Sequence, residues 1–318
     1  MTHLGDAARP GGTARLDDPA RPGGTARLDD PARPGGTAPA LVVRLSGVAK
    51  TWPAADGSET EALSGVDLDI APGEFVSLIG PSGCGKSTLL RAIADLVRPS
   101  AGEIRVNGKP PGQARLDHDY GMVFQAPVLF DWRTVEENVR LPLEILGRPK
   151  AWSAERTRAM LELVELEGFA GHRPYELSGG MQQRVAIARA LSFEPRILLM
   201  DEPFGALDEM TRERLNDAVL RIWERTGTTI VFVTHSIPEA VYLSSRIVVM
   251  SARPGRIAGS VEVDLPRPRT DEVRETERFF GLITAVREIL RSGGDPPVTE
   301  PGPVAAGGPR TAPRTATI

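Results

Sequence analysis

The sequence has little cysteine, no long apolar run and no strong excess of either charge. Cys84 is its single cysteine, which excludes an intramolecular disulfide and a cysteine zinc cluster and fits a reducing compartment. Apolar stretches such as residues 197–200 and 230–233 are far shorter than the roughly 20 residues that a membrane-spanning helix needs. With 38 basic and 42 acidic side chains, the net charge of −4 offers no global attraction to nucleic acid or anionic lipid. We therefore expect a chain that neither crosses a bilayer nor coats DNA.

Both ends of the chain are poor in bulky apolar residues. Residues 8–40 repeat the segment ARPGGTARLDDP with a period of twelve, and residues 292–318 are rich in Gly, Pro, Ala and Thr. Such compositions cannot bury a core, so we predict disordered tails at 1–40 and 292–318 and a folded part at 41–291. The repeat is either a duplicated segment without function or a partner-binding one. The first residues also lack the apolar core of a signal peptide, so we expect no export.

The folded part alternates apolar runs of strand length with segments of helical periodicity. Short β-like runs come first, and the strand GEFVSLIG then passes through a glycine loop into the helical pattern KSTLLRAIADL. Residues 134–168 are predicted to be mainly helical, with Ser153 as an N-cap and Gly168 as the end, inside a helical insert at about 126–180. The later runs in RILLMDEP, TIVFVTH and RIVVM are typical of buried, largely parallel strands. The pattern predicts an α/β fold.

The segment GPSGCGKST, residues 80–88, has the spacing of a phosphate-binding loop and stands between a predicted strand and a predicted helix. Glycines allow successive N–H groups to turn inward around a polyphosphate at the helix N-terminus. Lys86 would add a positive charge for the β- and γ-phosphates, and the Ser87 hydroxyl is suited to Mg²⁺. Cys84 is open to a redox role or simply fills the loop. We predict that the whole segment binds the cofactor: Gly80, Pro81, Ser82, Gly83, Cys84, Gly85, Lys86, Ser87 and Thr88.

Polar side chains end three other predicted strands. In ILLMDE, Asp201 would face a Mg²⁺ ion while Glu202, at the strand exit, would accept a proton from the attacking water. His235 ends the run TIVFVT and is interpreted as a γ-phosphate contact. Gln125 follows the strand YGMVF, and its amide can orient water or bind a metal through its oxygen. Lys86, Gln125, Glu202 and His235 are thus the predicted catalytic residues, and Ser87, Gln125 and Asp201 the predicted metal ligands.

Together with the segment LSGGMQQR at 177–184, these motifs resemble the ATP-binding subunit of an ABC transporter over about residues 41–260. Residues 80–88 resemble the Walker A loop, Gln125 the Q-loop, LSGGMQQR the signature and residues 197–202 the Walker B strand. GALD at 205–208 resembles the D-loop, and His235 the switch histidine. The resemblance implies an ATPase that uses ATP and Mg²⁺. It also implies a P-loop NTPase fold of ABC type, with a mainly parallel core sheet, an antiparallel β subdomain and a helical insert subdomain.

The resemblance further implies that ATP is bound between two copies of the chain. In the family, the signature of a second subunit closes the open side of the nucleotide in a head-to-tail dimer. Ser178 would cap a helix, and Gly179 and Gly180 would bring backbone N–H groups to the phosphates of the partner copy. Asp208 is assigned to the nucleotide site by the D-loop match. The family usually stacks a tyrosine on adenine, where this chain has Trp52, so adenine stacking and core packing both remain open for that ring.

Further segments, including VFQAPVLFDWRTVEENVRLPLEI, resemble the importers of nitrate, sulfonate and taurine, a group that includes transporters of pyrimidine precursors. The implied partners are separate transmembrane permease subunits and a periplasmic or lipid-anchored solute-binding protein, with no nucleic acid. The expected location is the cytoplasmic face of the membrane. The alternative is a soluble ABC ATPase that acts on the ribosome or DNA. It is disfavoured because the stretch between Lys86 and Asp201 has no heptad array, cysteine cluster or basic patch.

Overall fold

The computed structural model of the chain describes residues 41–53 and 57–293 and contains a six-stranded core sheet. Its neighbouring strands are parallel except for the last pair, which is antiparallel. In spatial order the strands are β5 (Tyr120–Val123), β6 (Ile197–Asp201), β7 (Thr229–Val233), β3 (Phe75–Ile79), β8 (Arg246–Met250) and β9 (Ile257–Glu262). The predicted fold class, with a mainly parallel core sheet, is confirmed.

A second, antiparallel sheet lies apart from the core sheet in the order β2-β1-β4. Its strands are β1 (Val43–Pro53), β2 (Glu59–Ile70) and β4 (Ala101–Val106). Burial alternates along the end of β2, where Val66, Leu68 and Ile70 are buried and the residues between them are exposed. This alternation is expected of an antiparallel strand with one face on a core. The sheet is the predicted antiparallel β subdomain, with strands longer than the runs the sequence suggested.

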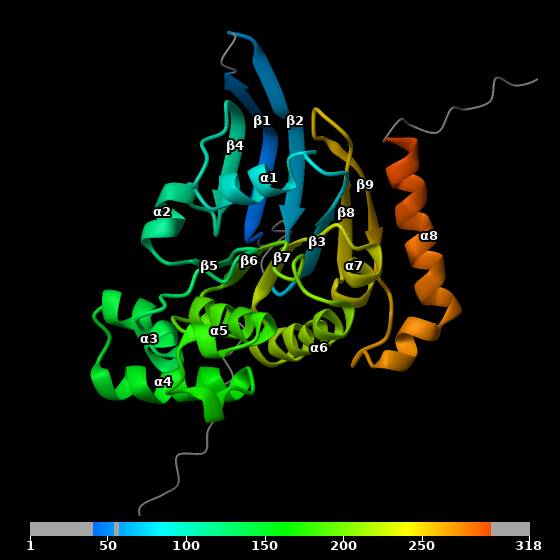
Figure 1. Cartoon of the computed structure of the whole chain (residues 1–318). Helices are drawn as coiled ribbons and strands as arrows, with labels where there is room; N and C mark the ends of the chain where they lie inside the picture. The colour runs from blue at the N-terminus through cyan, green and yellow to red at the C-terminus, as the bar shows by residue number, and fades with distance from the viewer. Residues whose placement is uncertain (1–40, 54–56, 294–318) are drawn as a thin grey trace, which may run out of the picture. The chain divides into compact units, whose positions relative to one another are not determined.

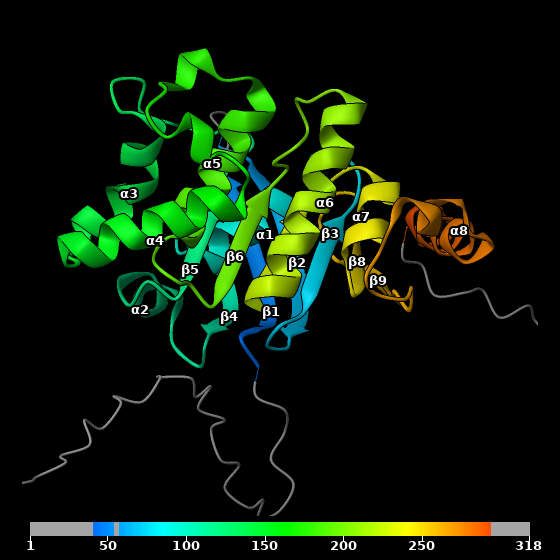
Figure 2. The same cartoon turned by 90° about the horizontal axis from the view of Figure 1, so that it is seen from below.

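Eight α-helices complete the described part of the chain. They are α1 (Lys86–Ile93), α2 (Pro111–Leu116), α3 (Val135–Ile145), α4 (Lys150–Leu163), α5 (Gly179–Leu191), α6 (Glu209–Thr226), α7 (Ile237–Leu243) and α8 (Glu277–Ser292). Short 3₁₀ turns occur at η1 (Glu167–Phe169), η2 (Pro174–Glu176) and η3 (Asp271–Glu275). Helices α5, α6 and α7 cover one face of the core sheet, and α8 lies beyond β9 (Figures 1 and 2).

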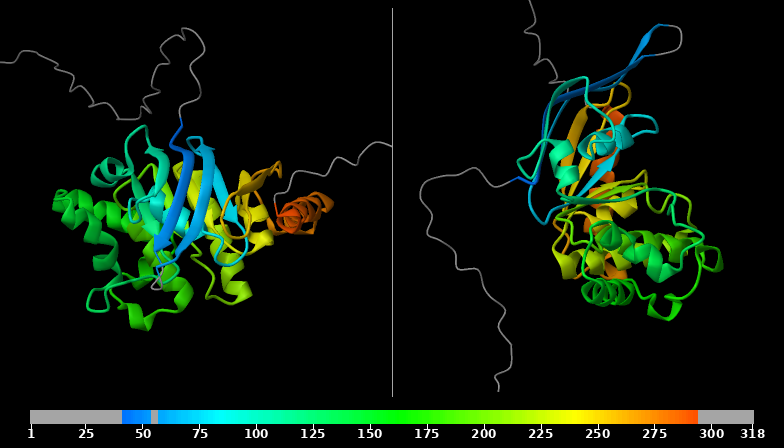
Figure 3. Two further views of the ribbon diagram at one scale, coloured as in Figure 1. Left: turned by 90° about the horizontal axis from the view of Figure 1, so that it is seen from above. Right: turned by 90° about the vertical axis from the view of Figure 1, so that its left-hand side faces the viewer.

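The two faces of the core sheet belong to two hydrophobic cores. In β3, Val76 and Leu78 join the cluster shared with α1 and the antiparallel sheet. Phe75 and Ile79 join the cluster shared with the helices on the opposite face. All five residues of β3 are therefore buried, as expected of a parallel strand covered on both sides. Figure 3 shows the blue antiparallel sheet and the green helices on opposite sides of the core.

The helical segment between β5 and α5 differs in detail from its sequence prediction. Thr134 caps α3 in a capping box with Glu137. The prediction that Ser153 is an N-cap is wrong, because α4 begins earlier, after Pro149, and Ser153 is buried inside it. The helix also ends at Leu163 rather than at Gly168. The error arose because a serine before an apolar stripe is typical of a cap, whereas here α4 begins after a proline instead.

The topology collects the predicted site at one edge of the core sheet. The adjacent strands β5, β6, β7 and β3 run parallel, so their carboxyl ends meet at the same edge. Each of these four ends leads into one of the predicted motifs: Gln125, the Asp201–Glu202 pair, His235 and the phosphate loop at 80–88. Ligands of parallel α/β sheets bind outside the carboxyl ends of the strands. The fold therefore brings together motifs that are separated by up to about 150 residues in sequence.

The low-complexity tails predicted at 1–40 and 292–318 lie outside the described residues, except for Ser292 and Gly293, which end α8. Within residues 41–53 and 57–293, no helix combines the length and the apolar character that crossing a membrane requires.

Candidate nucleotide-binding site

The phosphate loop (residues 80–88) connects β3 to α1, which begins at Lys86. Gly83 and Gly85 have φ values of 73° and 101°, a backbone region that L side chains rarely adopt. A Cβ on Gly85 would also lie 2.8 Å from the Ala62 carbonyl oxygen. Glycine is therefore required at residue 85 both for the backbone turn and for the close approach of β2.

Lys86 is turned into the loop. Its side chain is buried, and its Nζ donates to the carbonyl oxygens of Gly80 at 2.8 Å and Pro81 at 3.0 Å. These partners hold the ammonium group inside the loop whose N–H groups would enclose a phosphate. Its position fits the predicted role of neutralising the charge of the β- and γ-phosphates.

Ser87 joins the phosphate loop to the end of β6. Its hydroxyl donates to Oδ1 of Asp201 at 2.6 Å, and Asp201 is buried. Arg91 on α1 approaches Oδ2 of the same carboxylate at 3.4 Å. Two of the three residues predicted as metal ligands, from segments 114 positions apart, thus lie in direct contact.

Glu202 and His235 lie next to each other beyond the strand ends. Glu202 Oε2 lies 3.5 Å from His235 Nδ1, and both side chains are partly exposed. Glu202 has a φ of 45° although it is not a glycine, a conformation that costs about 1–3 kcal/mol and is concentrated at functional sites. A hydrogen bond from its N–H to the Val233 carbonyl oxygen, 3.0 Å long, fixes this backbone. The carboxylate is thereby held outside the sheet, where it can reach a water molecule.

Gln125 approaches this pair from β5. A Cβ built on Gly205 would lie 3.4 Å from Gln125 Nε2 and 3.7 Å from Glu202 Oε2, so both side chains flank Gly205. Gln125 is exposed. The structure thus brings Gln125 and the Glu202 carboxylate to the same glycine.

A cavity of about 330 Å³ lies over the phosphate loop. Its walls come from the loop, from β1 and β2, from the end of β6 and from the loop after β8. The lining residues are Trp52, Thr60, Ala62, Ser82, Gly83, Gly85, Lys86, Ser87, Thr88, Glu202 and Arg253. The Trp52 ring is 41% exposed, with Lys50 Nζ 4.3 Å from its centroid, so it is not part of the core. This exposure does not fit core packing, and adenine stacking by Trp52 stays a prediction.

The signature residues do not line this cavity. Ser178 caps α5 by accepting from Met181 N at 3.3 Å, and Gly179 beside it is exposed. Gly180 is buried against α6, where a Cβ would lie 2.6 Å from Thr211 Cγ2. Asp208 caps α6, and hydrogen bonds from the backbone N–H and the hydroxyl of Thr211 lower the pKa of its carboxyl. In a single chain the helix tip at Ser178 and Gly179 therefore points to solvent, as a site completed by a second copy requires.

Sequence reasoning missed three residues around the site. Arg253 lines the cavity, and Arg91 approaches Asp201. Glu239 is buried in α7, accepts a hydrogen bond from the Thr234 hydroxyl and has its pKa raised by burial. Because Thr234 precedes His235, Glu239 braces the loop that presents the histidine. An acid inside the apolar segment IPEAVYL was the one signal that could have identified Glu239.

The position of Cys84 allows a prediction. The thiol is 1% exposed and lies behind the phosphate loop, with Lys86 Nζ 3.9 Å from its sulfur. We expect N-ethylmaleimide to modify native protein about a hundredfold or more slowly than urea-unfolded protein, because the loop must open first. Mass spectrometry over time would measure both rates. Equal rates would show that the thiol is accessible and would revive a redox role.

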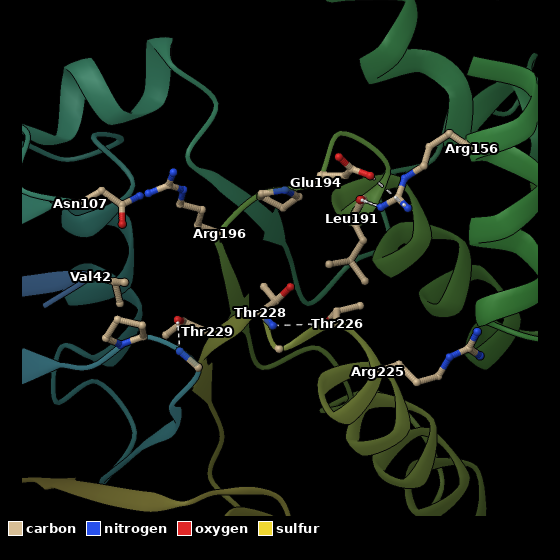
Figure 4. A pocket seen from close by; sticks show the side chains of 14 residues that line it. Val42, Asn107, Arg156, Leu191, Glu194, Arg196, Arg225, Thr226, Thr228 and Thr229 are labelled. Atoms are coloured by element: carbon tan, nitrogen blue, oxygen red, sulfur yellow. Dashed lines mark hydrogen bonds and ion pairs between the residues drawn. The ribbon is translucent and has the colours of Figure 1, made fainter. Parts of the chain in front are cut away.

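A larger cavity, of about 610 Å³, lies elsewhere. It is found near the amino ends of β6 and β7, where Arg196 and Thr229 line it. Figure 4 shows Arg196 directed toward Asn107, with Arg156 and Arg225 on the other side. None of the predicted site residues lines it, and Arg156 is engaged with the carbonyl oxygens at the end of α5. Size therefore does not identify the functional site here, whereas the convergence of motifs does.

Comparison with known sequences agrees with this geometry. The family model described as ABC transporter matches residues 63–205. An uncharacterized ABC transporter ATP-binding protein of Methanocaldococcus jannaschii is 50% identical over 239 residues, covering 74% of this chain and 86% of that protein. The aliphatic sulfonates import ATP-binding protein SsuB of Bacillus cereus is 42% identical over 254 residues, covering 80% of this chain and 98% of SsuB.

Two solved structures extend the likeness. A dimeric ATP-binding cassette in a post-hydrolysis state, bound to ADP and Pi, has a TM-score of 0.62 and 38% identity. The match covers 70% of this chain and 98% of that one. A subunit of the cbiONQ ABC transporter complex of Clostridium perfringens has a TM-score of 0.64 and 26% identity, covering 79% of this chain and 94% of that one. Both solved chains are thus matched over almost their whole length.

Proposed function

Because this chain belongs to the family of ABC transporter ATP-binding proteins, we propose that it binds and hydrolyses ATP as the energy-supplying subunit of an importer. The observation that carries the proposal is the convergence of four strand ends at one edge of the core sheet, beside the cavity over the phosphate loop. There the phosphate loop meets Asp201 through Ser87, and Glu202 lies beside His235. The relatives are ATP-binding cassettes, and one solved relative holds ADP and Pi.

The residues at the strand ends have the chemistry that in-line attack of water on the γ-phosphate requires. Glu202 would accept the proton of the attacking water, and His235, 3.5 Å from it, would position the transferred group. Lys86 would stabilise the charge that develops on the phosphate oxygens. Gln125, which like Glu202 lies beside Gly205, would orient the water or complete the metal shell.

The oxygen donors at Ser87 and Asp201 fit a Mg²⁺ ion that arrives with ATP. Among the described residues no cluster of three or more His, Cys, Asp or Glu side chains forms a metal site. Mg²⁺ in nucleotide sites needs no such cluster, because phosphate oxygens and water supply most of its ligands. The Ser87 hydroxyl, the Asp201 carboxylate and the Gln125 amide oxygen would hold the ion. When bound, it would neutralise phosphate charge during hydrolysis.

A second copy of the chain is the first proposed partner. The exposed Ser178 and Gly179 would close the nucleotide of the partner copy, and Asp208 and Gly180 would support that helix tip through α6. The dimeric state of one solved relative supports this arrangement. Two nucleotides would then be held head to tail between two copies.

A permease is the second proposed partner. The helical segment between β5 and α5 exposes several large apolar side chains, an arrangement that marks a binding surface. Val128, Trp132 and Ile145 are 60%, 71% and 75% exposed. We propose that this surface contacts a transmembrane permease at the cytoplasmic face of the membrane. The likeness to SsuB favours an aliphatic sulfonate as solute, with nitrate, taurine and pyrimidine precursors as the other candidates.

The permease proposal is tested by coexpression with candidate transmembrane permease subunits from the same organism. We expect the full chain to copurify with them from detergent-solubilised membranes, and Trp132→Ala to weaken that association about tenfold or more, because buried tryptophans are common interface anchors. The ATP hydrolysis rate of the isolated Trp132→Ala chain should stay within about twofold of wild type, since Trp132 does not line the cavity.

Leu116→Ala is the matched control, because Leu116 is also an exposed apolar residue but lies on α2. Equal retention of the Trp132 and Leu116 variants on the membrane subunits would refute the assigned surface. The solute is then identified by testing sulfonates, nitrate, taurine and pyrimidines for binding to the solute-binding protein of the purified complex.

A further inference from the structure

The loop that connects β8 to β9 packs directly on the phosphate loop. A Cβ on Gly255 would lie 2.0 Å from the Cys84 carbonyl oxygen, so only glycine permits this approach. Gly255 N donates to the Ala62 carbonyl oxygen at 3.0 Å, and Ser64 N donates to the Gly255 carbonyl oxygen at 3.0 Å. The loop is therefore fixed both to β2 and to the phosphate loop, and any side chain on it has a defined place relative to the cavity.

This loop places Arg253 at the cavity. Arg253 Nε donates to the Gly83 carbonyl oxygen at 2.8 Å, and a Cβ on Gly83 would lie 2.7 Å from an Arg253 terminal nitrogen. Over residues 41–53 and 57–293, this is the sole hydrogen bond or ion pair of its guanidinium. A guanidinium has five N–H donors, so four of them are left for a ligand. Because the side chain is exposed and lines the cavity, these donors are accessible from inside it.

The charges around the cavity indicate which ligand these donors meet. Lys86 is the other lining cation, and its ammonium group is turned onto the Gly80 and Pro81 carbonyl oxygens. Glu202 is the one acidic residue of the lining, and its oxygen lies beside His235. A triphosphate entering this cavity would therefore meet an arginine that no described carboxylate neutralises. Arginine forms strong charge-assisted hydrogen bonds with phosphate oxygens.

We propose that Arg253 is a nucleotide-binding residue, which donates to the phosphate oxygens of bound ATP while its Nε holds the Gly83 peptide. The inference rests on the proposed ATP-binding function of the cavity and adds a residue that none of the nucleotide-binding motifs contains. The position of Arg253 is set by Gly255, which packs on Cys84, 171 residues earlier in the chain. The contact of Arg253 with the phosphate loop therefore depends on the tertiary fold.

Three substitutions of Arg253 in the full chain separate its charge from its contact with Gly83. Calorimetric titration would give the affinity for ATP and for AMP. We expect Arg253→Ala and Arg253→Gln each to weaken ATP binding about tenfold, because alanine removes the side chain and glutamine keeps only a neutral donor. The ATP affinity of Arg253→Lys should stay within about threefold of wild type, because lysine keeps the charge. AMP binding should change less than ATP binding, since AMP lacks the outer phosphates. The loss of ATP affinity caused by Arg253→Ala should become smaller at high salt, because salt screens the charge.

Arg256→Ala is the matched control, because Arg256 is in the same loop but bonds to Ser64 Oγ and does not line the cavity. Its ATP affinity should remain within about twofold of wild type. The proposal is overturned if Arg253→Gln binds ATP as tightly as wild type, because Arg253 would then make only a structural contact. It is also overturned if the Arg253 variants lose affinity for ATP and for AMP equally. If the wild-type chain itself binds no ATP, the proposed function fails instead, so the two failures are distinguishable.

Discussion

Glu202→Gln is expected to lower ATP hydrolysis about 100-fold or more and to leave ATP binding nearly unchanged. The carboxylate lies beside His235 at the end of β6 and lines the cavity over the phosphate loop. Glutamine has almost the same shape but cannot accept a proton from water, and general bases contribute about 10²–10⁴-fold to rate. Phosphate release measures the turnover, and calorimetric titration measures the binding.

The same substitution should also change the oligomeric state. If hydrolysis reopens the dimer, the Glu202→Gln chain with ATP should accumulate as a dimer, which sedimentation velocity would detect. Glu155→Gln is the matched control, because Glu155 is exposed on α4 and lies outside the cavity lining. Near-normal turnover of the Glu202 variant would refute its assignment as the base, whereas loss of ATP binding would indicate that the carboxylate has a structural role.

The core sheet and the composition of the site were predictable from sequence because both depend on local patterns. Strands buried on both faces leave continuous apolar runs, such as residues 197–200 and 230–233. The phosphate loop, Gln125, the Asp201–Glu202 pair and His235 each follow a predicted strand, and parallel strands bring their carboxyl ends to one edge. Knowing that the strands are parallel was therefore enough to expect Gln125, Glu202 and His235 near the phosphate loop.

Contacts set by tertiary packing could not be predicted. Arg253 meets Gly83 only because the β8–β9 loop packs against β2 and residues 80–88, and no local pattern encodes that approach. The start of α4 was mispredicted because Ser153 has the residue type of a cap but is buried within the helix. Burial of Glu239 likewise depends on the packing of α7, which a single sequence does not reveal.

Gly179→Asp is expected to abolish hydrolysis while the chain keeps its own ATP binding. Gly179 is the first residue of α5 and is exposed, and a Cβ there would meet only Leu207 Cδ2, at 3.3 Å. An aspartate at a helix N-terminus is favourable for the helix itself, so the fold should persist. The same carboxylate would repel a phosphate that approaches this helix tip. We expect a hydrolysis rate lower by about 100-fold or more, no ATP-dependent dimer, and ATP affinity within about threefold.

Gly179→Ala is the matched control, since it adds the Cβ without the charge and should retain most of the hydrolysis. Lys86→Ala gives the opposite defect, because it removes the cation of the phosphate loop and should lose ATP binding itself. If Gly179→Asp lost ATP binding as completely as Lys86→Ala, the signature would act on the nucleotide of its own chain. That result would contradict the head-to-tail arrangement.

Mixing the two inactive chains tests the shared site most directly. In a mixed dimer, one nucleotide site contains both substitutions. The other site is intact, because the Gly179→Asp chain supplies a wild-type phosphate loop and the Lys86→Ala chain supplies a wild-type signature. With free exchange of subunits, about half of the dimers are mixed and each holds one intact site of two, so hydrolysis should recover to about a quarter of the wild-type rate. Neither chain gains a residue on mixing, and recovery therefore requires that the two chains contribute to one site.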